Sequence, residues 1–341
     1  MRSFPLSILD LAAVGREETV AESFVGSVEL ARAAERAGYR RVWYAEHHNI
    51  ASIASSATAV LIAHIAANTE TIRLGAGGVM LPNHSPLVIA EQFGTLAELH
   101  PGRIDLGLGR APGTDQITWR ALRRDPLASD RFPQDVVELQ GLLSDKSPLP
   151  GIHAIPGEGT HVPLYILGSS LFGAQLAAEL GLPYAFASHF APQLLFEAIA
   201  AYREGFKPSQ QLESPHVIAG VGVIAAESSE EAAEQFEATR RARARNLFSR
   251  GDRRLSSEEV DAVLASHRAA VVDEMLTYTA TGTAEQAAAY LEDFRQRTGA
   301  DELITVHYAN TAAGRVRSVE LLAGAVDPTG ERAADGTISG A

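Results

Sequence analysis

The sequence predicts an α/β fold, a single closed (β/α)8 TIM barrel with insertions after strands 4 and 7. Short β-rich runs alternate with longer helical patterns, which is typical of successive βα units. Eight such runs follow one another over residues 1–326 without a break in composition, which suits one barrel better than two dinucleotide-binding halves. The 341 residues exceed the roughly 250 of a typical barrel, so the surplus must form insertions.

The expected strands begin close to the N-terminus and recur along the whole barrel region. They lie at 5–11, 41–48, 72–81, 103–111, 163–168, 183–189, 216–225 and 302–310. The expected helices lie at 20–37, 55–68, 86–100, 131–144, 170–180, 192–206, 229–248, 284–298 and 315–325. Because a helix lies between successive strands, we expect those strands to be parallel.

Local signals at the helix ends support this division. Gly38, Gly181 and Gly299 stand where left-handed C-caps belong, and Ser85-Pro86 places a cap residue before a proline that needs no N–H. Three pairs have capping-box spacing, namely Ser228/Glu231, Ser256/Glu259 and Thr283/Gln286.

The remaining residues form two insertions and a tail. Residues 145–162 are rich in proline and glycine and read as a long loop, and a second insertion covers about 248–282. Loops of this length often act as lids, so we expect both insertions to close over a site. Residues 327–341 are mostly glycine, alanine and polar residues and predict a disordered tail.

Composition narrows the function. The chain contains no cysteine, which excludes disulfides, iron–sulfur clusters, thiolate zinc sites and a cysteine nucleophile. A net charge of −13 repels nucleic acid and acidic membranes, so we expect a small-molecule partner, with no nucleic acid and no membrane. Pro5 and Asp10 interrupt any secretory apolar core, so a cytoplasmic location is expected. The charge-free run 49–69 predicts a buried helix of a soluble protein rather than a membrane span.

Polar residues and glycines gather at the predicted carboxyl ends of the strands, where barrel enzymes place their active groups. This coincidence predicts a single site on one rim. The residues are Asp10, Glu46-His47-His48, Gly75-Ala76-Gly77-Gly78, Gly107-Leu108-Gly109-Arg110, Gly168-Ser169-Ser170, Ser188-His189 and His307-Tyr308-Asn310.

Glu46-His47-His48 offers two imidazoles beside a carboxylate, which suits general acid–base chemistry, metal ligation or a structural pair. Adjacent side chains on a strand point to opposite faces, so His47 and His48 are poorly placed to bind one ion. We therefore favour acid–base chemistry and expect no metal.

The glycines and Arg110 each allow more than one interpretation. Gly77-Gly78 lies within an apolar strand, where glycine serves a bulge, a close approach to a ligand or simple packing. Arg110 fits an anion clamp or a surface ion pair, and Gly168-Ser169-Ser170 fits a phosphate cradle or an ordinary N-cap. Proline replaces the third glycine of a dinucleotide fingerprint after Arg110, which excludes that motif.

One basic stretch stands apart from this rim. It contains Arg240, Arg241, Arg243, Arg245, Arg250, Arg253 and Arg254. A solvated helix face that balances nearby glutamates explains it better than a nucleic-acid site does.

Together these motifs resemble the bacterial luciferase-like flavin monooxygenases. The resemblance lies in 42–48 (Val-Trp-Tyr-Ala-Glu-His-His), 75–82 (Gly-Ala-Gly-Gly-Val-Met-Leu-Pro), 84–86 (His-Ser-Pro), 101–110 (Pro-Gly-Arg-Ile-Asp-Leu-Gly-Leu-Gly-Arg) and 181–183 (Gly-Leu-Pro). It covers residues 1–225 well and the remainder by element order alone. The combination is specific for the superfamily but identifies no substrate.

The resemblance implies FMN at the carboxyl rim of a (β/α)8 barrel. Arg110, Ser169 and Ser170 would hold its phosphate, and Glu46 would lie near the flavin. Gly77-Gly78 matches the position of a non-prolyl cis peptide, and His47 matches a histidine that transfers protons, with His48 as its less critical neighbour. We count Asp10 and Gly168 among the cofactor-binding residues because of their place on the rim.

In such an enzyme reduced FMN, supplied by a separate flavin reductase, reacts with O2 to a C4a-peroxyflavin that oxidises a small organic substrate. The family also implies a homodimer through the helices after strands 2 and 3. Two alternatives stay open, an F420-dependent hydride-transfer oxidoreductase of the same superfamily and a non-catalytic flavin-binding protein. F420 carries a long acidic tail that needs a basic groove, and Arg110 is the one cation that the sequence places there.

Overall fold

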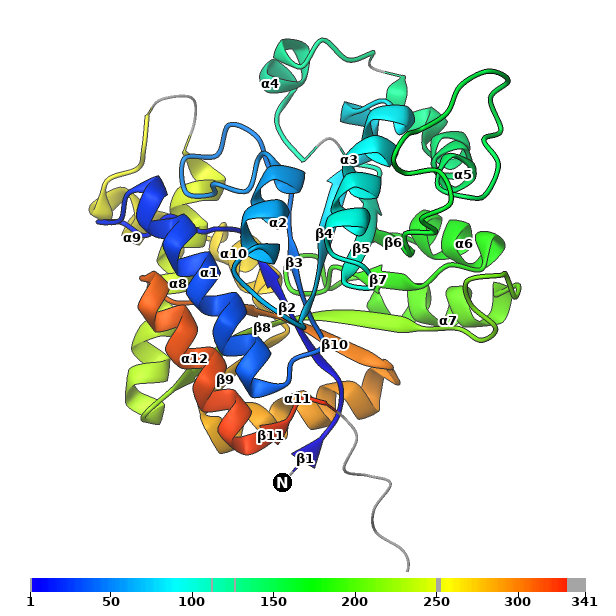
Figure 1. The fold of residues 1–341 in the computed structure, drawn as a ribbon. Helices are drawn as coiled ribbons and strands as arrows, with labels where there is room; N and C mark the ends of the chain where they lie inside the picture. The colour runs from blue at the N-terminus through cyan, green and yellow to red at the C-terminus, as the bar shows by residue number, and fades with distance from the viewer. Residues whose placement is uncertain (1, 112, 126, 250–252, 330–341) are drawn as a thin grey trace, which may run out of the picture.

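A closed parallel barrel forms the centre of the molecule (Figure 1). The computed structural model describes residues 2–111, 113–125, 127–249 and 253–329. Eight of the described strands form the ring, and β10 pairs with both β2 and β8 and so closes it. In ring order they are β2 (Leu6–Asp10), β3 (Arg41–Tyr44), β4 (Arg73–Met80), β5 (Ile104–Gly109), β6 (Leu164–Gly168), β7 (Tyr184–Phe186), β8 (Val217–Ala226) and β10 (Glu302–His307). The predicted (β/α)8 barrel is confirmed.

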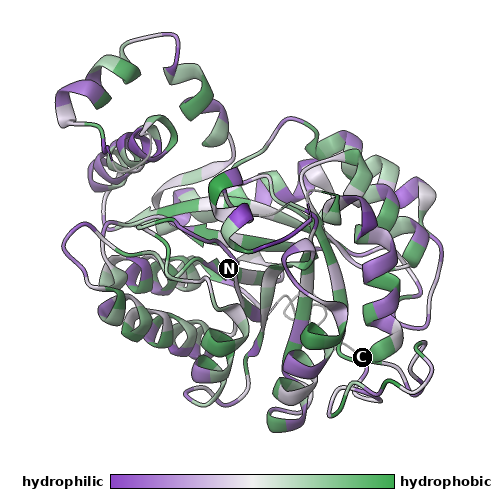
Figure 2. Ribbon diagram, turned by 90° about the horizontal axis from the view of Figure 1, so that it is seen from above, coloured by the Kyte–Doolittle hydropathy of each residue, from purple (hydrophilic) through white to green (hydrophobic). Residues whose placement is uncertain are grey.

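Helices surround the barrel at every predicted position. They are α1 (Val20–Ala37), α2 (Thr58–Ala66), α3 (Pro86–Leu99), α5 (Phe132–Leu142), α6 (Leu171–Leu180), α7 (Leu195–Gly205), α8 (Ser229–Phe248), α11 (Ala284–Thr298) and α12 (Ala312–Ala325). The first and last of them, α1 and α12, lie side by side (Figure 1). The helices carry both hydrophilic and hydrophobic residues, as expected for a layer between core and solvent (Figure 2).

Most of the predicted helix ends are confirmed. Gly38, Gly181 and Gly299 are left-handed C-caps with φ of 81°, 63° and 64°. The boxes that begin at Ser256 and Thr283 are complete. The third box is half formed, because the Ser228 hydroxyl accepts the Glu231 N–H while the Glu231 carboxylate accepts the Glu227 N–H instead.

Residues 145–162 do not form the expected lid. They connect the end of α5 to the start of β6, so they lead to the amino-terminal end of a strand, away from the carboxyl rim. Gly157 packs against Gly94 of α3 so closely that a Cβ on Gly94 would lie 2.1 Å from the Gly157 Cα. The glycines of this insertion thus serve packing on the outside of the barrel. The segment that does follow a carboxyl end leads from β5 to α5 and carries α4 (Gln116–Ala121) and the 3-10 helix η2 (Ala128–Arg131).

The second insertion is more ordered than a loop. It contains α9 (Ser257–Leu264), α10 (Ala269–Met275) and β9 (Thr279–Thr283), which pairs in parallel with the carboxyl-terminal half of β8. Val260, Val263, Val272 and Leu276 form a small apolar cluster with Ala244 of α8. This cluster fixes the insertion beside the carboxyl ends of β8 and β10, where partly buried Tyr308 packs on it.

Short elements complete the chain. The 3-10 helix η1 (Leu81–Asn83) follows β4, and β1 (Arg2–Ser3) pairs with β11 (Val326–Asp327) across the bottom of the barrel in Figure 1. The expected disordered tail begins inside β11, and its residues from 330 on lie outside the described part of the chain. Within the described residues, no helix has both the length and the apolar character that crossing a bilayer requires.

Buried charges fill one layer of the barrel interior. Arg41 of β3, 2% exposed, donates from Nη1 to Asp105 Oδ2 of β5 and to the Tyr165 hydroxyl of β6, both at 2.7 Å. Its Nε lies 3.0 Å from Glu302 Oε1 of β10. Trp43, two residues along β3 and therefore on the same face, donates to Asp105 at 3.2 Å. These bonds join four strands across the barrel.

Two more strands join this layer. Ser7 of β2 donates to Glu302, and Arg73 of β4 donates to Asp105. Burial by itself would raise the pKa of Glu302, but the charge of Arg41, with His216 and Ser7, lowers it to about 2. We call Arg41, Asp105, Glu302, Ser7 and Tyr165 the interior ion network.

Removing one member of the interior ion network leaves a charge buried without its partner. We expect Arg41→Met to lower the free energy of unfolding by about 3–5 kcal/mol, measured by urea denaturation. Arg36, whose side chain is 67% exposed and lies 3.8 Å from Glu320, provides the control, and Arg36→Met should change stability by less than about 1 kcal/mol. Equal losses in the two variants would contradict a stabilising role for the network.

Candidate functional site

Glu46 lies just beyond the end of β3 and is the centre of a hydrogen-bond cluster. It is 2% exposed and accepts the Met80 N–H at 3.0 Å and the Nε2 atoms of His48 and His84 at 2.9 Å. Asn83 donates to the same carboxylate at 3.2 Å. Burial would raise the pKa of Glu46, but the bonds from His48, His84 and Met80 outweigh it and lower the pKa to about 2. Glu46 is therefore an ionised, fully engaged carboxylate that orients two imidazoles.

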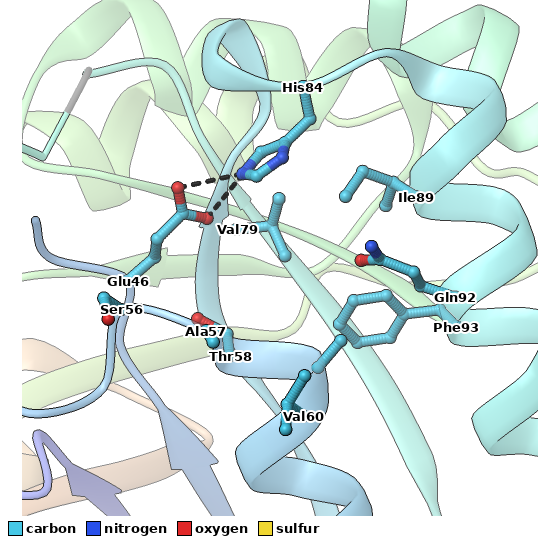
Figure 3. A pocket seen from close by; sticks show the side chains of 11 residues that line it. Glu46, Ser56, Ala57, Thr58, Val60, Val79, His84, Ile89, Gln92 and Phe93 are labelled. Carbon is cyan, nitrogen blue, oxygen red and sulfur yellow. Dashed lines mark hydrogen bonds and ion pairs between the residues drawn. The ribbon is translucent and has the colours of Figure 1, made fainter. Parts of the chain in front are cut away.

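A small cavity reaches this cluster from outside the barrel, between α2 and α3 (Figure 3). Thr58 and Val60 line it from α2, and Ile89, Gln92 and Phe93 line it from α3, with Glu46 and His84 at one end. Its volume of about 120 Å³ is well below the roughly 300 Å³ at which ligand pockets begin. The cavity is therefore too small for a flavin and belongs to the outer surface rather than to the rim.

His47 and His48 turn to different partners, as the alternation of side chains predicts. His47 donates from Nδ1 to the Gly113 carbonyl at 3.2 Å, which leaves Nε2 with the lone pair. Burial lowers the pKa of His47, whereas the hydrogen bond to Glu46 raises the pKa of His48. At neutral pH the first imidazole is therefore neutral and able to accept a proton. Gly113 makes this contact possible because its φ is +64° and a Cβ would lie 2.8 Å from the Glu46 carbonyl.

The Gly77-Gly78 peptide bond is cis, in agreement with the implied position. The register between β4 and β5 shifts between Ala76 and Val79, so the chain bulges at this point. A Cβ on Gly77 would lie 2.7 Å from Leu9 Cδ1, and one on Gly78 would lie 2.7 Å from the Gly107 carbonyl oxygen. Both positions therefore require glycine, because a side chain would collide with the neighbouring strands.

Arg110 lies beside the start of α6. Its guanidinium stacks on Phe172 of α6, 4.2 Å from the ring centroid. In the described part of the chain no carboxylate lies within 4.0 Å of it, so the surface ion pair is not formed. Ser170 is the N-cap of α6, yet its hydroxyl caps no helix N–H, and Gly168 and Ser169 precede it half-buried. A cation and an uncapped helix start thus lie together, which is the donor set of an anion site.

Asp10 is used within the protein. Its Oδ1 accepts the Ala12 N–H at 2.9 Å, and its Oδ2 accepts the Ser27 hydroxyl at 2.6 Å. It is 4% exposed, so the structure places it in the supporting layer beneath the rim rather than on the surface.

From the sequence alone, three further residues of the rim were assigned no role. Arg243 of α8 donates to the Tyr308 hydroxyl at 3.0 Å, and Tyr308 donates to the carbonyl of His189 at 3.3 Å. Burial, with the charges of Arg243 and His47, lowers the pKa of His189 to about 3. A signal existed in Gly220-Val-Gly222, since glycine at alternate positions of an apolar strand leaves space on one face. His84 had a weaker signal, a histidine directly after a strand end.

The depressed pKa of Glu46 makes stability depend on pH. The ordinary value is 4.5 and the folded value about 2, so the ionised carboxylate stabilises the protein above about pH 5, and this contribution is lost as the pH falls toward 2. We expect Glu46→Gln to lower the free energy of unfolding by about 3 kcal/mol at pH 7, and by less at pH 3.5. Exposed Glu98 gives the control, because Glu98→Gln should show no such pH-dependent loss. Urea denaturation at the two pH values measures both, and a pH-independent difference would contradict the pKa shift.

Comparison with known proteins agrees with this geometry. The family model of the luciferase-like monooxygenases matches residues 4–302. A luciferase-like monooxygenase of Escherichia coli (strain K12) is 45% identical over 94% of this chain and 96% of its own. An N-acetyl-S-alkylcysteine monooxygenase of Bacillus subtilis (strain 168) is 36% identical over 84% of this chain and 79% of its own. The crystal structure of apo-MsnO8 is 37% identical, with a TM-score of 0.84 over 94% of this chain and 98% of that one.

More distant structures share the fold alone. One is an F420-dependent secondary alcohol dehydrogenase, 16% identical with a TM-score of 0.70 over 96% of this chain and 99% of that one. Another is the oxygenating constituent of 3,6-diketocamphane monooxygenase of Pseudomonas putida in complex with FMN, 15% identical with a TM-score of 0.71 over 96% and 98%. The family match and the two relatives above 30% identity leave one conclusion: the chain belongs to the luciferase-like monooxygenases, which are oxidoreductases.

Proposed function

We propose that this chain is an FMN-dependent monooxygenase that uses reduced FMN and O2 to oxidise a small organic substrate. One observation carries the proposal. An anion-binding corner at Arg110 and α6 and a neutral imidazole at His47 lie on the same rim, with the bare backbone of Gly77-Gly78 on the strand next to that of Arg110.

The phosphate of FMN fits the anion-binding corner. Arg110 and the uncapped N–H groups at the start of α6 supply charge and donors, and the Ser169 and Ser170 hydroxyls add two more. Gly168 would let the chain approach the phosphate closely, because it brings no side chain to this corner.

The flavin ring fits the backbone surface of β4 and β5. Gly77, Gly78 and Gly107 present main chain without side chains, and Leu9 and Trp43 support this surface from the barrel interior. When bound, reduced FMN supplies the electrons that activate O2. The protein's part is to hold the ring, keep water away and move one proton.

His47 is the group that we assign to the proton. Its Nδ1 is held by the Gly113 carbonyl, so Nε2 can take up a proton and return it. His48 is hydrogen-bonded to Glu46, so we assign it the role of holding the cluster in position and not that of transferring the proton. Glu46 and Asp10 position the rim, the first through its four donors and the second through Ala12 and Ser27.

F420 is the alternative cofactor for the same rim. The segment between β5 and α5 carries exposed Arg120, Arg123 and Arg124 beyond Arg110, so more cations accompany this segment than the sequence pattern suggested. We keep FMN because the phosphate corner and His47 account for it with no further group. A separate reductase would supply reduced FMN, since the proposal assigns no site to a nicotinamide donor.

We also propose a homodimer through α2 and α3. Val60 of α2, which lines the small cavity of Figure 3, is 71% exposed, and Val88 of α3 is 43% exposed. Exposed apolar side chains on neighbouring helices are well suited to burial against a second copy.

Mutations should distinguish the residue that binds the FMN phosphate from the residue that moves the proton. We expect Arg110→Ala to weaken binding of reduced FMN by about 10- to 100-fold, because a charge-assisted bond to phosphate is lost. His47→Ala should leave that affinity within about threefold but change the return of oxidised-flavin absorbance when air is admitted after an anaerobic titration. Equal loss of affinity in both variants would contradict the separate roles. Tighter binding of reduced F420 than of reduced FMN would favour the alternative cofactor.

A charged substitution on the proposed dimer face, at Val60 of α2, tests whether the protein dimerises there. Val60→Asp should convert a dimer into a monomer in light scattering, because a buried carboxylate finds no partner there. Val25→Asp is the matched control, since Val25 is 59% exposed on α1, and it should leave the dimer intact. A monomeric wild-type protein, or a dimer in both variants, would overturn this interface.

A further inference from the structure

Two glycines of β8 open the rim on the side away from Arg110. A Cβ on Gly220 would lie 2.5 Å from His189 Nδ1, and one on Gly222 would lie 2.6 Å from Tyr308 Cε2. Alternate residues share one face of a strand, so β8 makes room for one ring from β7's end and one from β10's end. The two rings are thereby held next to each other at the carboxyl end of the barrel.

Arg243 reaches this pair from α8. Its Nη2 donates to the Tyr308 hydroxyl at 3.0 Å, and its guanidinium lies 5.4 Å from the centroid of the same ring. Two other arginines of this helix have carboxylate partners. Arg240 binds Asp273 of α10, and Arg241 binds Asp261 of α9. Among the described residues Arg243 has no carboxylate within 4.0 Å, and it is half-buried. A half-buried cation without a counter-ion is costly unless an anion joins it.

His189 adds a buried ring to the same place, with its Nδ1 packed against Gly220 of β8. It is 8% exposed, and its Nδ1 has no hydrogen-bond partner in the described part of the chain. The Tyr308 hydroxyl accepts from Arg243 and donates to the His189 carbonyl, so these three residues lie together. Partly buried Leu11, Leu167 and Tyr308 pack on the apolar barrel interior around this point. The rim here therefore combines an apolar floor with a cationic edge.

This edge is distinct from the phosphate corner. Arg110 follows β5, the fourth strand of the ring, and Tyr308 follows β10, the eighth. Three strands lie between them in either direction, so Arg110 and Tyr308, with its partner Arg243, stand on opposite sides of the ring. His47, which follows the second strand, lies between them around the ring. One anion cannot contact both arginines.

We propose that Arg243 binds a carboxylate on the organic substrate, while the Tyr308 hydroxyl, whose own proton goes to the His189 carbonyl, holds the guanidinium in position. The apolar remainder of that substrate is directed over the barrel toward His47. The inference rests on the proposed function for what happens to the substrate afterwards. It does not rest on it for binding, because the site is complete without flavin. The substrate class is thus a small amphipathic carboxylate, and Arg243 determines that preference.

Binding of hexanoate and of its neutral counterpart hexanamide to the flavin-free full chain tests the proposal, measured by calorimetry or ligand-observed NMR. We expect hexanoate to bind more tightly than hexanamide to the wild-type protein. Arg243→Met should weaken hexanoate binding by about tenfold or more and leave hexanamide binding unchanged. Tyr308→Phe, which keeps the ring that fills the space over Gly222, should weaken hexanoate binding by a smaller factor.

Arg241→Met is the matched control, because it removes the same charge two residues away on the same helix. It should leave hexanoate binding unchanged. The proposal is overturned if hexanoate binds no better than hexanamide, or if Arg243→Met and Arg241→Met weaken it equally. Since no flavin or turnover is involved, these outcomes are independent of whether FMN binds at Arg110.

Discussion

The interior ion network is the constraint on which the rest of this structure depends. Arg41, Asp105 and Glu302 are almost completely buried, and the bonds that they make join six of the eight barrel strands. Buried charges tolerate little change in geometry, because each loses water and recovers the cost only through well-placed partners. The network therefore sets how the strands are arranged, and with them where their carboxyl ends lie. An apolar layer with Trp43 and Ile304 separates the network from the rim above.

On that rim, the supporting layer decides which side chains remain available for chemistry. Glu46 and Asp10 are carboxylates whose oxygens are already occupied, so their effect is to hold neighbours in place. His47 and His48 are adjacent in sequence, yet burial lowers the pKa of the first and the hydrogen bond to Glu46 raises the pKa of the second. Arg110 and Arg243 stand at opposite positions of the ring and lack carboxylate partners within the described residues. Two cations of this kind divide the rim into two anion-binding sides.

Sequence reasoning succeeded where the signal is local. The strands and helices of the barrel follow from alternating patterns, and the C-caps at Gly38, Gly181 and Gly299 follow from the need for a positive φ. It failed where the answer depends on what lies across space. The composition of residues 145–162 predicted a lid, but Gly157 of this segment packs on Gly94 of α3, on the outside of the barrel. Arg240 does pair with a nearby glutamate, Glu237, as expected. The helices of the second insertion add Asp273 as a partner of Arg240 and Asp261 as a partner of Arg241, which the sequence pattern did not indicate.

By itself the sequence determined the barrel, the rim and the family to which the chain belongs, because periodicity, glycine positions and strand-end motifs are properties of neighbouring residues. Tertiary structure decided the state of each functional group. The partners of Glu46 come from two separate segments, His48 and residues 80–84, and the space for His189 and Tyr308 comes from Gly220 and Gly222 on another strand. Burial, counter-ions and hydrogen-bond partners are set by residues far apart in the chain, and they determine which imidazole is neutral and which arginine is left to bind a ligand.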